Sequence, residues 1–141
     1  MGKRRAGREL VLSVLFQVDI AAAPSDEALA SAINAKNADA ETIEFTRRLI
    51  DLTLEHAKEI DDLLSQYAKQ WPLDRMANVD RCLLRMAVSE ILYCPDIPNS
   101  VAVDEAVELA KKYSTAESGR FINGILGSLL RDMPEEAPSP T

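Results

Sequence analysis

Residues 78–93, with the sequence NVDRCLLRMAVSEILY, are apolar on most sides when they are wound into a helix. A helix with this pattern is buried, because almost none of its faces suits water. The pair Trp71-Pro72 ends the element before it, and Pro95 and Pro98 make a rigid turn after it. We therefore predict a central helix at 78–93, with the rest of the fold packed around it.

The segments on either side also carry apolar residues at helical spacing and not at the alternating spacing of strands. Only five glycines and seven prolines interrupt the whole chain. Gly124 and Gly127 fall inside the last segment, where we expect another backbone to pack closely. The further predicted helices run from about residue 5 to 20, from Ser25 through Ile33, from the polar break at 37–40 to about Tyr67, from 101 to 113, and from 116 to 133.

The length of 141 residues is enough for one hydrophobic core. We predict an all-α, single compact domain of about seven helices, arranged as two packed small helical bundles. The predicted domain spans residues 1–133, and the tail 134–141, rich in Pro and Glu, is predicted to be disordered.

No pattern in the chain is typical of catalysis or of a metal or cofactor site. His56 is the single histidine, and Cys82 and Cys94 lack the spacing of a metal-binding pair. Gly-rich phosphate loops and nucleophile motifs do not occur in the sequence either. We therefore predict a protein that is not an enzyme and that uses no metal or cofactor.

Positive charge is concentrated at the start of an otherwise acidic chain. The sequence has 16 basic and 23 acidic residues, a net charge of −7. Without the four residues Lys3, Arg4, Arg5 and Arg8, which we call the basic arm, the count is 12 against 23, a net charge of −11. A local cluster of this kind suits nucleic-acid phosphate, although a solvated, disordered tail explains the charge equally well.

The basic arm and the apolar stretch 10–20 also have to be distinguished from a signal peptide. Glu9, Gln17 and Asp19 argue against one, because a translocated segment rarely carries acidic residues at both of its edges. No stretch of the chain approaches the roughly 20 apolar residues of a membrane span. We expect a cytoplasmic protein that does not associate with a membrane.

Three residues outside the arm have chemistry that suits RNA bases. The amide of Gln17 can read a base edge, and Phe121, at the margin of a buried stripe, can stack on a base. Glu117 ends the sequence Ser114-Thr115-Ala116-Glu117, a capping-box pattern in which its carboxylate bonds the backbone amide of Ser114. For Glu117, a capping role and contact with a ligand both remain open.

Two long segments resemble the C-terminal signature of the bacterial transcription antitermination factors of the NusB family: VAVDEAVELAKKY at 101–113 and FINGIL at 121–126. The arginine-rich start that leads into Leu15-Phe16-Gln17 resembles the N-terminal helix of that family. Val79-Asp80-Arg81 and the later Glu90 resemble its central helix. The resemblance covers nearly the whole chain, except 21–37 and the tail.

This resemblance implies an all-α RNA-binding protein that pairs with NusE, a ribosomal small-subunit protein. The two proteins recognise boxA-type single-stranded RNA within the RNA polymerase antitermination complex and support transcription of ribosomal RNA operons. The resemblance also allows a homodimer.

The resemblance assigns roles to individual residues of this sequence. Phe16 and Asp80 match positions at the NusE face. Tyr67, Glu117 and Phe121 match positions along the RNA path, and Glu117 stands where an Asp is familiar. The residues of the basic arm would hold RNA phosphates: Lys3, Arg4, Arg5 and Arg8.

Two other interpretations remain open on the sequence alone. The chain also resembles the leading domain of certain ribosomal RNA methyltransferases, an interpretation that a cofactor-binding domain continuous with Thr141 would support. A purely structural helical adaptor without RNA affinity is the third reading, in which the basic arm is only solvated.

Overall fold

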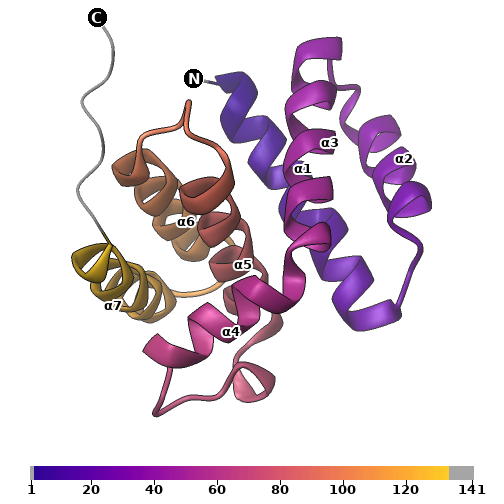
Figure 1. Cartoon of the computed structure of the whole chain (residues 1–141). Helices are drawn as coiled ribbons and strands as arrows, with labels where there is room; N and C mark the ends of the chain where they lie inside the picture. Colours follow the sequence, from indigo (N-terminus) through magenta and orange to yellow (C-terminus); the bar gives the residue numbers. More distant parts are fainter. Residues whose placement is uncertain (1, 134–141) are drawn as a thin grey trace, which may run out of the picture.

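The computed structural model describes residues 2–133, which form seven α-helices, one short 3₁₀-helix and no strand (Figure 1). This confirms the all-α fold expected from the apolar spacing. The predicted disordered tail, 134–141, lies outside the described residues. The elements are α1 (Gly2–Ala21), α2 (Ser25–Lys36), α3 (Ala40–Glu55), α4 (Ala57–Tyr67), η1 (Leu73–Arg75), α5 (Asn78–Tyr93), α6 (Asn99–Tyr113) and α7 (Ala116–Asp132).

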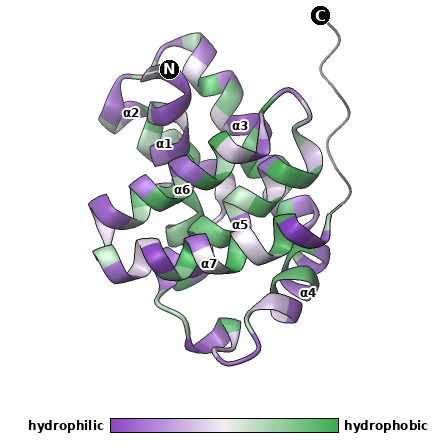
Figure 2. Cartoon of the chain, turned by 90° about the vertical axis from the view of Figure 1, so that its left-hand side faces the viewer, coloured by the Kyte–Doolittle hydropathy of each residue, from purple (hydrophilic) through white to green (hydrophobic). Residues whose placement is uncertain are grey.

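The helices are grouped as α1–α3 on one side and α4–α7 on the other (Figure 1). α5 contacts helices of both groups, namely α1 and α3 in the first and α4, α6 and α7 in the second. Figure 2 shows hydrophobic residues concentrated around α5 and hydrophilic residues toward the outer turns. The central position predicted for 78–93 is therefore confirmed, and its fully buried residues include Leu83, Leu84, Met86, Ala87 and Val88.

The long helix predicted to end near Tyr67 is in fact two helices, so that prediction is wrong. α3 ends at Glu55, and His56 leaves helical geometry at φ −104° and ψ 20° before α4 begins. The His56 ring stacks on Tyr93 of α5, with 3.9 Å between the ring centroids. The break turns the chain from the α1 side of α5 to its α7 side, so both apolar faces are buried although they point in different directions.

The closest packing at a glycine occurs at Gly7 in α1, and not, as predicted, at Gly124 or Gly127 in α7. A Cβ atom built on Gly7 would lie 2.6 Å from Cδ2 of Phe45 and 3.2 Å from Oγ1 of Thr46, both on α3. Gly124 has nothing within 4 Å of such an atom, and Gly127 meets only the end of a flexible arginine. The absence of a side chain at Gly7 is therefore what lets α1 approach α3.

We expect Gly7→Ala to destabilise the protein by about 1 kcal/mol. The added methyl improves helix propensity by about 1 kcal/mol, but overpacking against Phe45 costs about 1–3 kcal/mol. Gly124→Ala is the matched control, because its methyl meets open space and it gains propensity by up to about 1 kcal/mol. Urea unfolding measures both, and equal stability of the two variants would contradict the close approach.

No helix within residues 2–133 combines the length and the apolar character that crossing a membrane requires.

Candidate nucleic-acid interface

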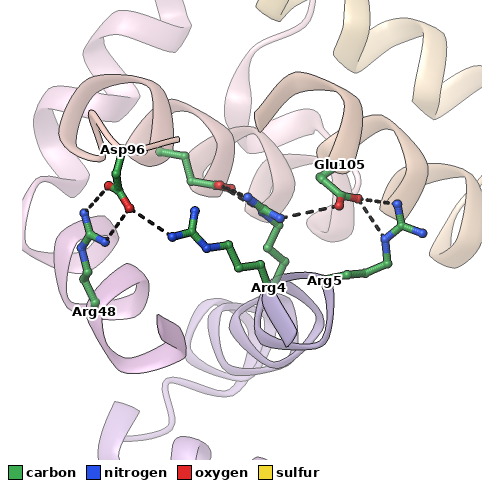
Figure 3. A network of polar contacts seen from close by, with 7 residues as sticks. Arg4, Arg5, Arg48, Asp96 and Glu105 are labelled. Atoms are coloured by element: carbon green, nitrogen blue, oxygen red, sulfur yellow. Dashed lines mark hydrogen bonds and ion pairs between the residues drawn. The ribbon is translucent and has the colours of Figure 1, made fainter. Parts of the chain in front are cut away.

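The basic arm is part of a helix and not a disordered tail, because residues 2–8 form the first two turns of α1. Its three exposed cations each meet a carboxylate. Lys3 Nζ lies 2.8 Å from Glu41, Arg4 Nη2 lies 3.2 Å from Asp96, and Arg5 Nη2 lies 2.9 Å from Glu105. Figure 3 shows the arginines of this network. An RNA phosphate that binds the arm therefore has to replace carboxylates of the protein itself.

Arg8 does not lie on this surface, which corrects its predicted role as a phosphate ligand. Arg8 is only 1% exposed, and its guanidinium donates hydrogen bonds to both carboxylate oxygens of Glu90 at 2.6–3.1 Å. Glu105 lies 3.6 Å from the remaining nitrogen. Burial raises the pKa of Glu90, and the guanidinium of Arg8 opposes that shift. Arg8 therefore holds α1 to α5 inside the protein.

A hollow of about 560 Å³ brings together three of the predicted site residues. Glu117 and Phe121 come from the first turns of α7, and Asp80 comes from the first turn of α5. Glu117 is exposed and Phe121 is half-buried. The remaining lining residues are Gln70, Trp71, Thr115 and Ser118. Trp71 is more than half exposed, so the hollow presents two aromatic side chains beside carboxylates.

The predicted capping box at Ser114–Glu117 does not form. Thr115 is the N-cap of α7, and its Oγ1 accepts a hydrogen bond from the backbone N–H of Ser118 at 3.0 Å. The N-cap is thus Thr115, one residue later than the Ser114 of the capping-box pattern, and this removes Glu117 from the position that reaches back to the cap. Among residues 2–133, no hydrogen bond or ion pair involves the Glu117 carboxylate, so it is available to a ligand.

Asp80 is buried beside the hollow, and only one of its two carboxylate oxygens has a hydrogen-bond partner among residues 2–133. Its Oδ2 accepts a hydrogen bond from Oγ of Ser118 at 3.1 Å, whereas Oδ1 has no partner in the part of the chain that the structure describes. Burial raises the pKa of Asp80, because removal from water disfavours the charged carboxylate. Asp80 was predicted at the partner face, but its neighbours are the predicted RNA residues Glu117 and Phe121.

The structure places Tyr67 away from this hollow. Its hydroxyl donates a hydrogen bond to Asp132 at 2.8 Å, at the last residue of α7. Glu117 is on the first turn of the same helix, and 15 residues of helix span about 22 Å. Tyr67 and the hollow are therefore at opposite ends of α7.

A second depression, a groove of about 430 Å³, contains the other two predicted residues. Phe16 and Gln17 line it from α1, together with Ala32 and Lys36 of α2 and Tyr113 at the end of α6. The Gln17 amide donates to Ser13 Oγ at 3.4 Å. The structure thus groups Gln17, predicted to read RNA, with Phe16, predicted to bind the protein partner.

Two consecutive residues at the start of α5 line different depressions, Val79 the groove and Asp80 the hollow. The aromatic ring of Trp71 made it one of the chain's few candidates for base stacking, but the sequence did not place it in the hollow. Sequence reasoning missed Ser118 in the hollow and both Asp96 and Glu105 opposite the arm. No sequence signal pointed to these three residues, because each acquires its role from a neighbour that is distant along the chain. No group of three or more potential metal-ligating side chains occurs among residues 2–133.

Comparison with known proteins gives the same family as the sequence resemblance. The NusB family matches this chain over residues 5–131. The transcription antitermination protein NusB of Symbiobacterium thermophilum is 51% identical, over 92% of this chain and 90% of the relative. The structure of T. maritima NusB is similar with a TM-score of 0.85 and 38% identity, over 92% of this chain and 91% of that chain. A chain in a crystal structure of antitermination factors NusB and NusE in complex with dsRNA gives a TM-score of 0.87 at 25% identity, over 94% and 99% of the two chains.

Proposed function

The chain belongs to the NusB family, and we propose that it is a transcription antitermination factor that binds boxA-type RNA together with a NusE-type protein. The observation that carries the RNA-binding part is the hollow at the start of α7. It combines the exposed carboxylate of Glu117 with the aromatic side chains of Phe121 and Trp71. Aromatic faces stack on unpaired bases, and a free carboxylate accepts hydrogen bonds from base amino groups.

The basic arm supports this proposal by supplying phosphate contacts. Lys3, Arg4 and Arg5 lie on the first turns of α1, which contain no acidic residue. The free backbone N–H groups at this end of the helix add to the positive potential of the three cations. Because the whole chain carries a net charge of −7, attraction to RNA depends on local clusters of cations such as this one.

The groove between α1 and α2 is where we place the protein partner. Its lining is mostly apolar, and Phe16 is 36% exposed although it is a large hydrophobic residue. An exposed aromatic in an apolar groove is typical of a protein–protein contact. Since Val79 of the groove and Asp80 of the hollow are consecutive residues of α5, a partner in the groove can extend the RNA-binding surface.

In this proposal the protein acts by binding and not by catalysis, as a component of the RNA polymerase antitermination complex in the cytoplasm. Tyr67 and the homodimer suggested by the family resemblance stay predictions.

The test is a titration of a boxA-containing RNA and a scrambled RNA of the same length, each with and without NusE, followed by fluorescence anisotropy. We expect the boxA RNA to bind more tightly than the scrambled RNA, with a larger difference when NusE is present. The scrambled sequence controls for attraction to phosphate, which is independent of sequence. Equal affinity for both RNAs in all four titrations would contradict the proposal.

A further inference from the structure

Asp96 lies between two arginines that come from different helices. Its Oδ2 is 3.2 Å from Nη2 of Arg4 on α1, and its Oδ1 is 2.8 Å from Nη2 of Arg48 on α3. Arg48 Nη1 also donates to Oδ2 at 3.4 Å, so this guanidinium holds the carboxylate with two nitrogens (Figure 3). All three side chains are more than 40% exposed, so solvent and ligands can reach them.

This arrangement has the geometry of an anion site. Two guanidiniums that converge on one acceptor group are a common way to hold a phosphate, and a carboxylate offers the same planar pair of oxygens. Arg4 and Arg48 also line one small depression of about 230 Å³, and its other lining residues are Lys3, Phe45 and the carboxylates Glu41 and Glu44. The Phe45 ring lies under Arg4, 5.4 Å from its guanidinium carbon, and so supports the position of that guanidinium.

We infer that Arg48 is a further phosphate-binding residue beside the basic arm, and that Asp96 occupies the phosphate position in the free protein. The inference rests on the proposed RNA-binding function and names a residue that lies about 40 positions beyond the arm in sequence. RNA binding then exchanges one anion for another: the phosphate takes the place of Asp96 between Arg4 and Arg48.

The negative charge of Asp96 at neutral pH agrees with this exchange. The guanidinium of Arg48 holds the pKa of Asp96 at about 2, so the aspartate is ionised and competes with phosphate throughout the physiological range. An ion pair this exposed is weak, because water screens it and two side chains have to be ordered. A phosphate that brings several further contacts from the same RNA can therefore displace it.

The first test compares Arg48→Ala with Arg47→Ala. Both remove one positive charge from an exposed position on α3, but Arg47 has no ion pair among residues 2–133 and does not border the depression. We expect Arg48→Ala to weaken binding of boxA RNA about three- to tenfold, and to reduce the slope of log affinity against log salt by about 0.7–0.9. Arg47→Ala is expected to leave both quantities near wild type. Equal effects of the two variants would overturn the assignment of Arg48.

The second test removes the competing carboxylate with Asp96→Asn, and Asp51→Asn on the exposed face of α3 controls for the change in net charge. We expect Asp96→Asn to tighten RNA binding about two- to fivefold at low salt, since an amide competes poorly for guanidiniums. The gain is expected to be smaller when Asp96→Asn is made in an Arg48→Ala background, because only Arg4 is then released. If Asp96→Asn binds RNA like Asp51→Asn, Asp96 is not a competitor and the inference is wrong.

These outcomes are separable from a failure of the proposed function. Wild-type protein that does not prefer boxA RNA contradicts both the function and this inference. Wild-type protein that prefers boxA RNA, with Arg48→Ala indistinguishable from Arg47→Ala, contradicts the inference alone. Thermal unfolding of each variant establishes that affinity is compared between folded proteins.

Discussion

Arg8→Ala is expected to lower the free energy of unfolding by about 3–5 kcal/mol, the largest loss that we predict for a single residue of the basic arm. Arg8 is almost fully buried and makes three hydrogen bonds to Glu90, which has no exposed surface. Removing the guanidinium leaves the Glu90 carboxylate in the protein interior without its main partner. The carboxylate then has to stay charged without compensation or take up a proton, and either outcome costs stability.

Urea unfolding at neutral pH measures this loss, with Arg5→Ala as the matched control. Arg5 lies on the same helix and also pairs with a carboxylate, but its side chain is 56% exposed. Its ion pair is screened by water, so its removal is expected to change stability far less than the removal of Arg8. The double variant Arg8→Met/Glu90→Met is expected to recover most of the loss, because it leaves no unpaired charge. If Arg8→Ala is as stable as Arg5→Ala, the buried pair does not hold the two helices together.

The contrast between Arg8 and its neighbours shows a limit of reasoning from the sequence. By residue type, Arg8 belongs to the cluster of Lys3, Arg4 and Arg5, and charge alone places all four on the phosphate surface. Its carboxylate partner lies 82 residues later. Helical periodicity identifies the apolar face of α1, but it does not reveal whether a basic residue beside that face finds a buried acid on another helix.

The local sequence pattern was sufficient to predict the helices, but it was not sufficient to predict the breaks between them. The apolar pattern at 78–93 located α5, because a helix without a polar face has only one stable environment. The break at His56 was not visible, because apolar residues continue at helical spacing on both sides of it. The directions of α3 and α4 depend on the helices packed against each of them in the folded chain: α1 and α5 against α3, and α5 and α7 against α4.

The family resemblance assigned Glu117 and Phe121 to the RNA path, and in the structure both line one hollow. It did not predict that Asp80 would join them or that Gln17 would lie in the groove with Phe16. Those groupings depend on the order in which helices meet around the start of α5. A residue's neighbours in space determine which ligand it can contact, and one sequence without its fold does not supply them.

Phe121→Ala is expected to weaken binding of boxA RNA by about 1–3 kcal/mol, at every salt concentration, because a ring that stacks on a base contributes about that much. The double variant Arg4→Ala/Arg5→Ala is expected to behave differently. Its loss is largest at low salt and shrinks as salt rises, because phosphate contacts release bound counterions and a variant without them has a smaller slope. Titrations at several salt concentrations therefore separate the two kinds of contact within one experiment.

Phe121 also packs against the hydrophobic core, so its replacement affects packing as well as stacking. Phe121→Leu is the control, because leucine keeps an apolar side chain against the core but has no aromatic face. We expect Phe121→Leu to bind RNA nearly as weakly as Phe121→Ala while its thermal stability stays closer to wild type. If Phe121→Leu binds RNA like wild type, the ring acts only through packing. In that case the hollow beside Glu117 is not where a base stacks, and base contact has to be sought elsewhere on the protein.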